Sequence, residues 1–326
     1  MTSDPTAALA QAACAFWGAT ARPPQLIKAR ENIVYQIWLP EGQKAALRLH
    51  RPGYQSVSAI GAELDWTADL ARLGQPVPQP VAGRDGGWTV RVGDRVASVV
   101  GWLEGTAIGA SERALDGDAP AQAALFGRIG RLIGGIHAAT DRIVFARHPD
   151  RPRWDINGLL GDAPLWGRFW QNPALSAADV ALVGAARLSA RERLQALMAG
   201  GCDFGLIHAD VLRENVLDRA EGLALIDFDD SGYGFRLYDL GTALVQSLEE
   251  PHLPALAHTL AEGYGAARGC TAPDPRSLLL FTMLRAMASC GWIVSRAGDD
   301  DPRQGFYAER AVRLSRHWLA GTTPFD

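Results

Sequence analysis

The chain has 326 residues and a formal net charge of -4, and 48% of its residues are hydrophobic and 21% charged. These proportions are those of a globular protein with a sizeable core, and they exclude a disordered or collagen-like chain. The small acidic surplus argues against a nucleic-acid partner, because non-specific binding to nucleic acid needs a positive field.

Neither a targeting segment nor a membrane span is expected from the sequence. The N-terminus has no basic region followed by an apolar one, and the purest apolar stretch, Val96 to Leu103, is far too short to cross a bilayer. The cysteines, Cys14, Cys202, Cys270 and Cys290, form no C-x-x-C pair, so neither a zinc site nor a disulfide framework is indicated. We expect a cytoplasmic protein with reduced thiols and no membrane partner.

The first hundred or so residues read as a β-rich region. Ile33 to Leu39 is rich in β-branched and aromatic residues, as strands are, and Ile60, Leu64 and Leu70 recur at helical spacing. The elements predicted here are a helix within residues 1–25, strands over 33–39 and 45–49, a helix over 56–73, and a hairpin over 88–92 and 95–103.

After Gly105 the pattern changes to helices. Asp118 and Pro120 mark a helix start. Further helices are predicted over residues 177–200, 253–268, 275–297 and 303–319, and an irregular segment over 146–175. The sequence therefore predicts an α+β protein with two lobes, a small β-rich N-terminal lobe over residues 1–103 and a larger, mainly helical lobe over 104–326.

The most informative pattern lies between residues 205 and 230. His208, Asp210 and Asn215 have the spacing H-x-D-x-x-x-x-N and follow a short apolar run, and Asp227 and Asp229 follow a second such run. Apolar runs of this length predict strands, so these polar side chains are expected at strand ends, where a rigid frame positions them.

This spacing matches the needs of phosphoryl transfer. One carboxylate must orient an attacking hydroxyl and accept its proton, while an amide oxygen and a second carboxylate hold Mg²⁺ on the phosphate oxygens. We assign the first role to Asp210 and the second to Asn215 and Asp227, with His208 organising the loop. Asp229 stays open between a metal neighbour and a structural partner.

The sequence resembles the aminoglycoside phosphotransferase and choline kinase superfamily, which has a protein-kinase-like fold. The nearest branch is formed by bacterial homoserine-kinase-like and stress-response-kinase-like proteins. The resemblance runs from Asn32 to about Trp318. Besides the loop and the D-x-D, it is carried by Glu31-Asn32-Ile33-Val34-Tyr35, Ala46-Leu47-Arg48-Leu49-His50-Arg51-Pro52, Glu63, Gly74-Gln75-Pro76-Val77-Pro78 and Trp102-Leu103-Glu104-Gly105.

The resemblance implies an ATP- and Mg²⁺-dependent kinase with Asp210 as the catalytic base and Asn215 and Asp227 as metal ligands. It implies that Glu63 comes from the helix facing the nucleotide. Asp239 stays open between hydrogen-bonding the catalytic loop and capping a helix. The nucleotide site would also include Arg48, and Val100, Trp102 and Leu103, whose strand would offer backbone groups to the adenine.

The chain departs from the family pattern in two places. Arg48 stands where the family usually has a phosphate-binding lysine; it keeps the charge, but its planar fork has a different geometry. Ala29-Arg30-Glu31-Asn32 stands where a glycine-rich loop over the nucleotide could be expected. As an alternative to a nucleotide-binding role, Arg48 and Glu63 could form a surface ion pair.

The leading hypothesis is a kinase that moves the γ-phosphoryl of ATP to a hydroxyl of a small molecule, such as an amino alcohol, a homoserine-like compound, a sugar or an aminoglycoside-like compound. Residues 230–238 leave no room for a long activation segment, although the stress-response branch keeps a protein Ser/Thr substrate open. Other hypotheses are a phosphatase with Asp227 as nucleophile and Asp229 as acid, and a weakly active protein that binds a nucleotide or metabolite.

Two features bear on the acceptor. Trp154, Trp166 and Trp170 could form a cation–π cage for an amine, although packing of a long loop is the simpler interpretation. The acidic runs Glu249-Glu250 and Asp299-Asp300-Asp301 could attract a cation or could be solvated. The oligomeric state is expected to be a monomer or a homodimer.

Overall fold

The computed structural model describes residues 5–29, 32–111, 113–143 and 150–326. The chain divides into two compact units, and each is described by itself. The first unit comprises Met1–Gly105, Ile143–Arg151 and Ala224–Asp229, and the second comprises Thr106–Arg142, Pro152–Leu223 and Asp230–Asp326. The Asp227-Phe228-Asp229 segment therefore belongs to the first unit, although it comes late in the chain.

The first unit is built on an antiparallel five-stranded sheet in the order β1-β2-β3-β5-β4. Its elements are α1 (Pro5–Trp17), β1 (Gln25–Ala29), β2 (Ile33–Trp38), β3 (Lys44–Leu49), α2 (Val57–Arg72), β4 (Thr89–Val92) and β5 (Arg95–Gly101). The expected strands, hairpin and second helix are confirmed, and β1 was not predicted. The expected loop over residues 29–32 lies partly outside the described residues.

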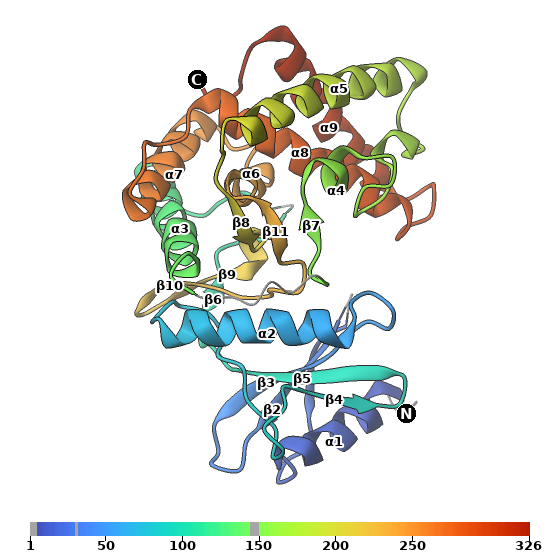
Figure 1. Ribbon diagram of the computed structural model, residues 1–326, viewed down its shortest axis with the longest axis vertical. Helices are drawn as coiled ribbons and strands as arrows, with labels where there is room; N and C mark the ends of the chain where they lie inside the picture. Colours follow the sequence, from blue (N-terminus) through green and yellow to red (C-terminus); the bar gives the residue numbers. More distant parts are fainter. Residues whose placement is uncertain (1–4, 30–31, 112, 144–149) are drawn as a thin grey trace. The chain divides into compact units, whose positions relative to one another are not determined.

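The pleat of β3 decides which side chains face α2. Leu47 and Leu49 are buried in a cluster with α1, which covers one face of the sheet. On the other face, Ile60 of α2 packs with Val96 of β5 (Figure 1). Because side chains alternate along a strand, Arg48 points to the α2 face.

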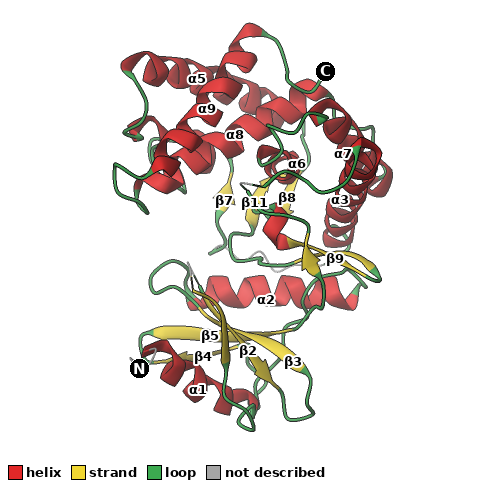
Figure 2. Cartoon of the chain, turned by 180° about the vertical axis from the view of Figure 1, so that it is seen from behind, coloured by secondary structure: helices red, strands yellow, loops and turns green. Residues whose placement is uncertain are grey.

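The second unit is mainly helical (Figure 2). Its helices are α3 (Ala119–Thr140), α4 (Ile156–Leu160), η1 (Phe169–Gln171), α5 (Ala177–Ala199), η2 (Arg213–Asn215), α6 (Leu237–Val245), α7 (Leu253–Arg268), α8 (Pro275–Val294) and α9 (Pro302–Ala320), where η denotes a 3-10 helix. The strands of this part of the chain are β6 (Thr106–Ala107), β7 (Arg153–Trp154), β8 (Phe204–Ile207), β9 (Val216–Arg219), β10 (Gly222–Leu225), whose last residues belong to the first unit, and β11 (Gly232–Phe235). The α+β class expected from the sequence is confirmed.

A small sheet positions the loop after β8. Strand β11 lies between β7, which is parallel to it, and β8, which is antiparallel. Helix α6 follows β11 and is buried at every position from Tyr238 to Val245. Sequence analysis did not predict α6, which is a short helix of 9 residues with a glycine, Gly241, in its middle, and a glycine there argues against a helix.

Helix α8 corrects the expectation that no segment qualifies as a membrane span. Among the described residues, Pro275–Val294 is long and apolar enough to cross a bilayer by length and composition. In the structure, 78% of its most apolar window is buried inside the protein, as in the core helix of a globular domain. The four cysteines are free thiols, and Cys14 and Cys290 are the buried ones.

Candidate active site

In the second unit, two side chains converge on the carboxylate of Asp210 (in the loop after β8). The Nδ2 of Asn215 donates hydrogen bonds to the Oδ2 and to the backbone carbonyl of Asp210, both at 2.9 Å. Arg285 on α8 donates to the Oδ1 at 2.7 Å. The motif had singled out Asn215 as a metal ligand and not for this contact, and nothing in the sequence pointed to Arg285, which comes 75 residues after Asp210.

The electrostatics of Asp210 suit a base. Burial raises the pKa of its carboxyl, although Arg285 and His208 act in the opposite direction, and the nearby Glu214 adds to the rise. A carboxylate with a raised pKa binds a proton more readily, so Asp210 has the property that proton abstraction from a hydroxyl requires.

The loop that carries Asp210 has a strained backbone and is held by hydrogen bonds to α6. Ala209 has a φ of 66°, a left-handed conformation that is costly for a residue other than glycine. Asp239 on α6 accepts hydrogen bonds from the backbone N–H groups of His208, at 2.9 Å, and Ala209, at 2.7 Å, while His137 lies 3.0 Å from the same carboxylate. The Nδ1 of His208 in turn accepts from the N–H of Asp210 at 3.2 Å. His208 and Asp239 therefore lie where the sequence predicted supports of the loop.

A buried arginine that sequence analysis missed holds the other end of this loop. Arg213 of η2 donates to Glu250 at 2.7 Å and to Ser247 at 2.9 Å, and its backbone N–H donates to Gln246 at 2.8 Å. The expected solvated acidic run thus includes a buried ion pair at Glu250. An arginine inside the H-x-D-x-x-x-x-N motif was the available signal.

The chemistry of Asn215 and Asp227 fits a hard divalent cation. The Nδ2 of Asn215 is engaged by Asp210, whereas its Oδ1 accepts no hydrogen bond from the described residues. Asp227, in the first unit, has a φ of 67°, and within the described residues Ala209 and Asp227 are the non-glycine residues with positive φ. Amide and carboxylate oxygens are the ligands that Mg²⁺ prefers.

In the first unit, Arg48 and Glu63 form a buried ion pair. The NH1 of Arg48 lies 2.7 Å from the Oε1 of Glu63, and the two side chains are only 8% and 2% exposed, so this is not a surface ion pair. The Nε and NH2 of Arg48 and the Oε2 of Glu63 are buried and have no hydrogen-bond partner among the described residues. Burial opposes the charge of Arg48, but Glu63, Asp229 and Asp227 outweigh it and raise the pKa of the guanidinium.

Asp229 is engaged by the first unit itself. Arg151 donates to the backbone carbonyls of Asp229, at 3.0 Å, and Phe228, at 3.3 Å. The Nδ1 of His50 lies 3.7 Å from the Asp229 carboxylate, and its Nε2 is hydrogen-bonded to Ser98 at 2.8 Å. Burial raises the pKa of Asp229, but His50, Arg48 and Arg151 together hold it below its ordinary value. Sequence analysis did not select His50 or Arg151 as site residues. His50 comes two residues after Arg48, and this spacing places side chains on the same face of a strand.

The expected adenine-binding segment follows β5. Val100 is paired with Ala46 of β3, and the backbone N–H of Trp102 donates to the carbonyl of Lys44 at 3.4 Å. The backbone of Leu103 has no hydrogen-bond partner within the part of the chain that the structure describes. Leu103 is thus the residue of this segment whose backbone groups are open to a ligand.

The tryptophans do not form a cage for an amine. Trp154 is buried, with 1% of its surface exposed. The guanidinium of Arg285 lies over Trp166 at 4.4 Å, and that of Arg187 lies over Trp170 at 4.2 Å. The protein's own cations therefore occupy these ring faces, and the simpler interpretation of packing is confirmed for Trp154.

Together, a β-rich unit with a buried arginine–glutamate pair and a helical unit with an aspartate–asparagine loop define the class of protein-kinase-like phosphotransferases. Residues 25–280 match the phosphotransferase enzyme family, and the chain belongs to that family. The enzyme class expected from the sequence, a phosphotransferase with an alcohol group as acceptor, is thereby confirmed.

Comparison with known proteins agrees with this assignment. An uncharacterised protein of Deinococcus radiodurans is 30% identical over 271 residues, which cover 79% of this chain and 73% of that protein. The structure of a microcompartment-associated aminopropanol kinase is 28% identical, with a TM-score of 0.81 and coverage of 96% of this chain and 98% of that one. An amicoumacin kinase, solved with AMP-PNP and Ca²⁺, shares the fold at 20% identity, with a TM-score of 0.74 and coverage of 99% and 96%.

A choline/ethanolamine kinase family protein of Mesorhizobium loti also shares the fold, at 20% identity and a TM-score of 0.64, with 100% of this chain and 97% of that chain covered. The expected resemblance to the aminoglycoside phosphotransferase and choline kinase superfamily, with its protein-kinase-like fold, is thus confirmed.

Proposed function

We propose that this enzyme moves the γ-phosphoryl group of ATP onto a hydroxyl of a small molecule, with a divalent cation, Mg²⁺, as cofactor. The observation that carries the proposal is the partly buried Asp210 carboxylate, which has a raised pKa and is oriented by Asn215 and Arg285. The solved neighbour named as an aminopropanol kinase supports a small acceptor over a protein substrate.

Each residue of the proposed site has a separate task. Asp210 orients the acceptor hydroxyl and accepts its proton. Asn215 and Asp227 would hold the cation, which neutralises charge on the phosphate oxygens when it is bound. Arg48, fixed by Glu63, would contact phosphate through its unpartnered nitrogens.

The competing phosphatase hypothesis fits the structure less well. It requires Asp229 to act as a protonated acid, whereas His50, Arg48 and Arg151 keep the pKa of that carboxyl low. It also leaves the strained loop around Asp210 without a task. The Asp227-Phe228-Asp229 segment is better explained as a metal-binding strand end held by Arg151.

A pair of variants tests the role assignment. Asp210→Asn should lower kcat by about a hundredfold or more, because it removes the base, yet leave binding of Mg-ATP nearly intact. Asp227→Ala should weaken binding of Mg-ATP itself. Nucleotide binding is measured as a magnesium-dependent rise in Tm. At a hundredfold excess of ligand over Kd, binding raises the free energy of unfolding by about 2.7 kcal/mol.

The two variants also separate the alternatives. Normal turnover in Asp227→Ala together with lost nucleotide binding in Asp210→Asn would contradict the assignment. A wild-type protein that binds Mg-ATP but forms no ADP with any alcohol would be a nucleotide-binding protein without kinase activity. Absence of any shift at millimolar Mg-ATP would reject the ATP site.

A further inference from the structure

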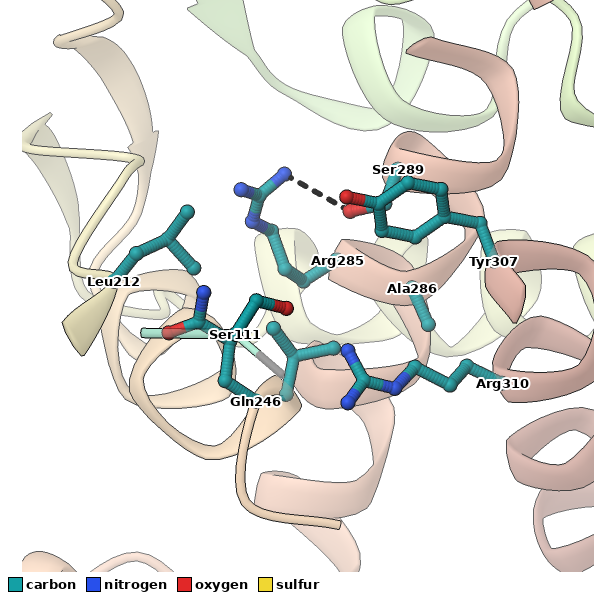
Figure 3. A pocket seen from close by; sticks show the side chains of 9 residues that line it. Ser111, Leu212, Gln246, Arg285, Ala286, Ser289, Tyr307 and Arg310 are labelled. Atoms are coloured by element: carbon teal, nitrogen blue, oxygen red, sulfur yellow. Dashed lines mark hydrogen bonds between the residues drawn. The ribbon is translucent and has the colours of Figure 1, made fainter. Parts of the chain in front are cut away.

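A small pocket opens in the second unit beside the loop of Asp210. The cavity itself has a volume of about 30 Å³, and the space is about 320 Å³ when the open solvent around it is included. It is lined by Ser111, Leu212, Val245, Gln246, Arg285, Ala286, Ser289, Tyr307 and Arg310 (Figure 3). Two of these residues lie close to the proposed base, Asp210. Arg285 donates a hydrogen bond to Asp210, and Leu212 comes two residues after Asp210 in the same loop. The pocket therefore borders the loop that carries Asp210.

The charged side chains that line this pocket are both arginines. Figure 3 shows Arg285, from α8, and Arg310, from α9, among the side chains that line the pocket, with the guanidinium group of Arg285 directed toward Ser289. The charge of Arg285 is matched by Asp210, and its NH1 also donates to Ser289 at 3.2 Å. No acidic residue among the described residues lines the pocket.

Arg310 is the group that lacks a counterion. Only 5% of its surface is exposed, its Nε is buried without a hydrogen-bond partner, and it forms no ion pair with the described residues. Its guanidinium lies over the ring of Phe306 at 4.1 Å. The acid that acts on it electrostatically, Glu249, is mostly exposed and is paired with Arg313 at 2.8 Å.

The electrostatics of this position agree with the geometry. Burial lowers the pKa of the Arg310 guanidinium to about 10, and the charges of Arg313 and Arg213 act in the same direction, whereas Glu249 and Tyr307 oppose them. A buried cation without a partner is costly to the fold. An anion that entered the pocket would supply the missing partner.

We propose that the phosphate acceptor is a small alcohol that carries an anionic group, a carboxylate or a phosphate monoester, and that Arg310 binds this group. The inference rests on the proposed function, because it takes Asp210 as the base that receives the hydroxyl. A guanidinium fork matches the paired oxygens of such anions. An ammonium group would meet two arginines and no acid in this pocket, so amino alcohols without an anionic group are disfavoured.

The test compares acceptors that share a carbon skeleton and differ in charge. The acid, neutral and amine forms are glycerate, glycerol and aminopropanediol, and gluconate, glucose and glucosamine; glycerol phosphate and glucose phosphate form the phosphate arm. ADP formation is measured for the wild type, Arg310→Met and Arg310→Lys. Arg316→Met, on the exposed side of the same helix, is the control.

We expect the wild type to prefer an anionic acceptor over the neutral and amine forms of the same skeleton. Arg310→Met should reduce kcat/KM for the anion by about tenfold to a hundredfold, chiefly through KM, and leave the neutral form nearly unchanged. Arg310→Lys should restore part of the loss, and Arg316→Met should have no effect. Whether the carboxylate or the phosphate arm responds identifies the anion.

Preference for the amine form, or an equal loss for all acceptors in Arg310→Met, would overturn the inference while leaving the kinase function intact. If no acceptor is consumed, thermal unfolding with the same compounds decides. A rise in Tm with an anion that Arg310→Met abolishes would support the anion site. If Tm rises with none of the anions, the inference is overturned. The Tm shift with Mg-ATP tests the kinase function separately.

Discussion

Single residues in this enzyme are fixed by contacts between parts of the chain that are distant in sequence. Asp239 accepts hydrogen bonds from two backbone amides of the loop that carries Asp210, one of them at the strained Ala209, and contacts the buried His137. Burial raises the pKa of Asp239, but the contacts with His137 and His208 outweigh it and hold the pKa below its ordinary value. The charged form of Asp239 is thus the form that stabilises the folded state.

The consequence for stability has a definite sign. A carboxyl whose pKa is lower in the folded state than the unfolded value of about 3.9 stabilises the fold above that pH, and the stabilisation is lost as the pH falls through the folded pKa. Asp239→Asn should therefore lower the free energy of unfolding by about 3 to 5 kcal/mol at pH 7. The difference from the wild type should shrink below about pH 4. Thermal unfolding of both proteins from pH 3 to pH 8 measures it, and a constant difference would contradict the argument.

At the scale of elements, helices α3 and α7 approach each other through glycines. A Cβ on Gly130 would lie 2.1 Å from the carbonyl oxygen of Leu260 and 2.8 Å from the backbone nitrogen of Tyr264. Both atoms belong to the backbone of α7 and cannot move away as a side chain would. The contact between the two helices therefore depends on the missing Cβ.

Gly130→Ala should separate the helices and lower the free energy of unfolding by about 1 to 3 kcal/mol, measured by urea unfolding. The matched control is Gly184→Ala in the middle of α5, where a Cβ would meet nothing within 4 Å. That variant should gain stability, by up to about 1 kcal/mol, because alanine favours a helix over glycine. If the two substitutions changed the free energy of unfolding equally, helix propensity and not the close approach of the helices would determine the effect.

At the scale of the whole molecule, the first unit is assembled from distant parts of the chain. Arg151 donates to the carbonyl of Ala59 in α2 at 3.0 Å, and the ring of Phe228 packs edge-on against Trp66 with centroids 5.3 Å apart. Trp66 is 1% exposed and Phe228 2% exposed. The boundary predicted between residues 103 and 104 separates Phe228 and Arg151 from these partners in α2.

A fragment of residues 1–105 should therefore fold poorly by itself. Without Phe228 and Arg151, Trp66 loses its aromatic neighbour and α2 loses a buried hydrogen-bond donor. The near-UV circular dichroism of the fragment should be weak, and amide protection in α2 should be lost, whereas the full chain keeps both. A fragment with the protection of the full chain would show that the N-terminal segment is self-sufficient.

The sequence by itself determined the α+β class, the longer helices and the family resemblance, and it singled out the residues of the H-x-D-x-x-x-x-N motif for the proposed site. These signals are local: helical or alternating spacing, capping residues, and the fixed interval from His208 to Asn215. Only the tertiary structure decided which distant residues complete each part of the site. Arg285 reaches Asp210, Arg151 reaches Asp229, and Arg310 stands buried without a counterion, because side chains far apart in the chain become neighbours only through packing.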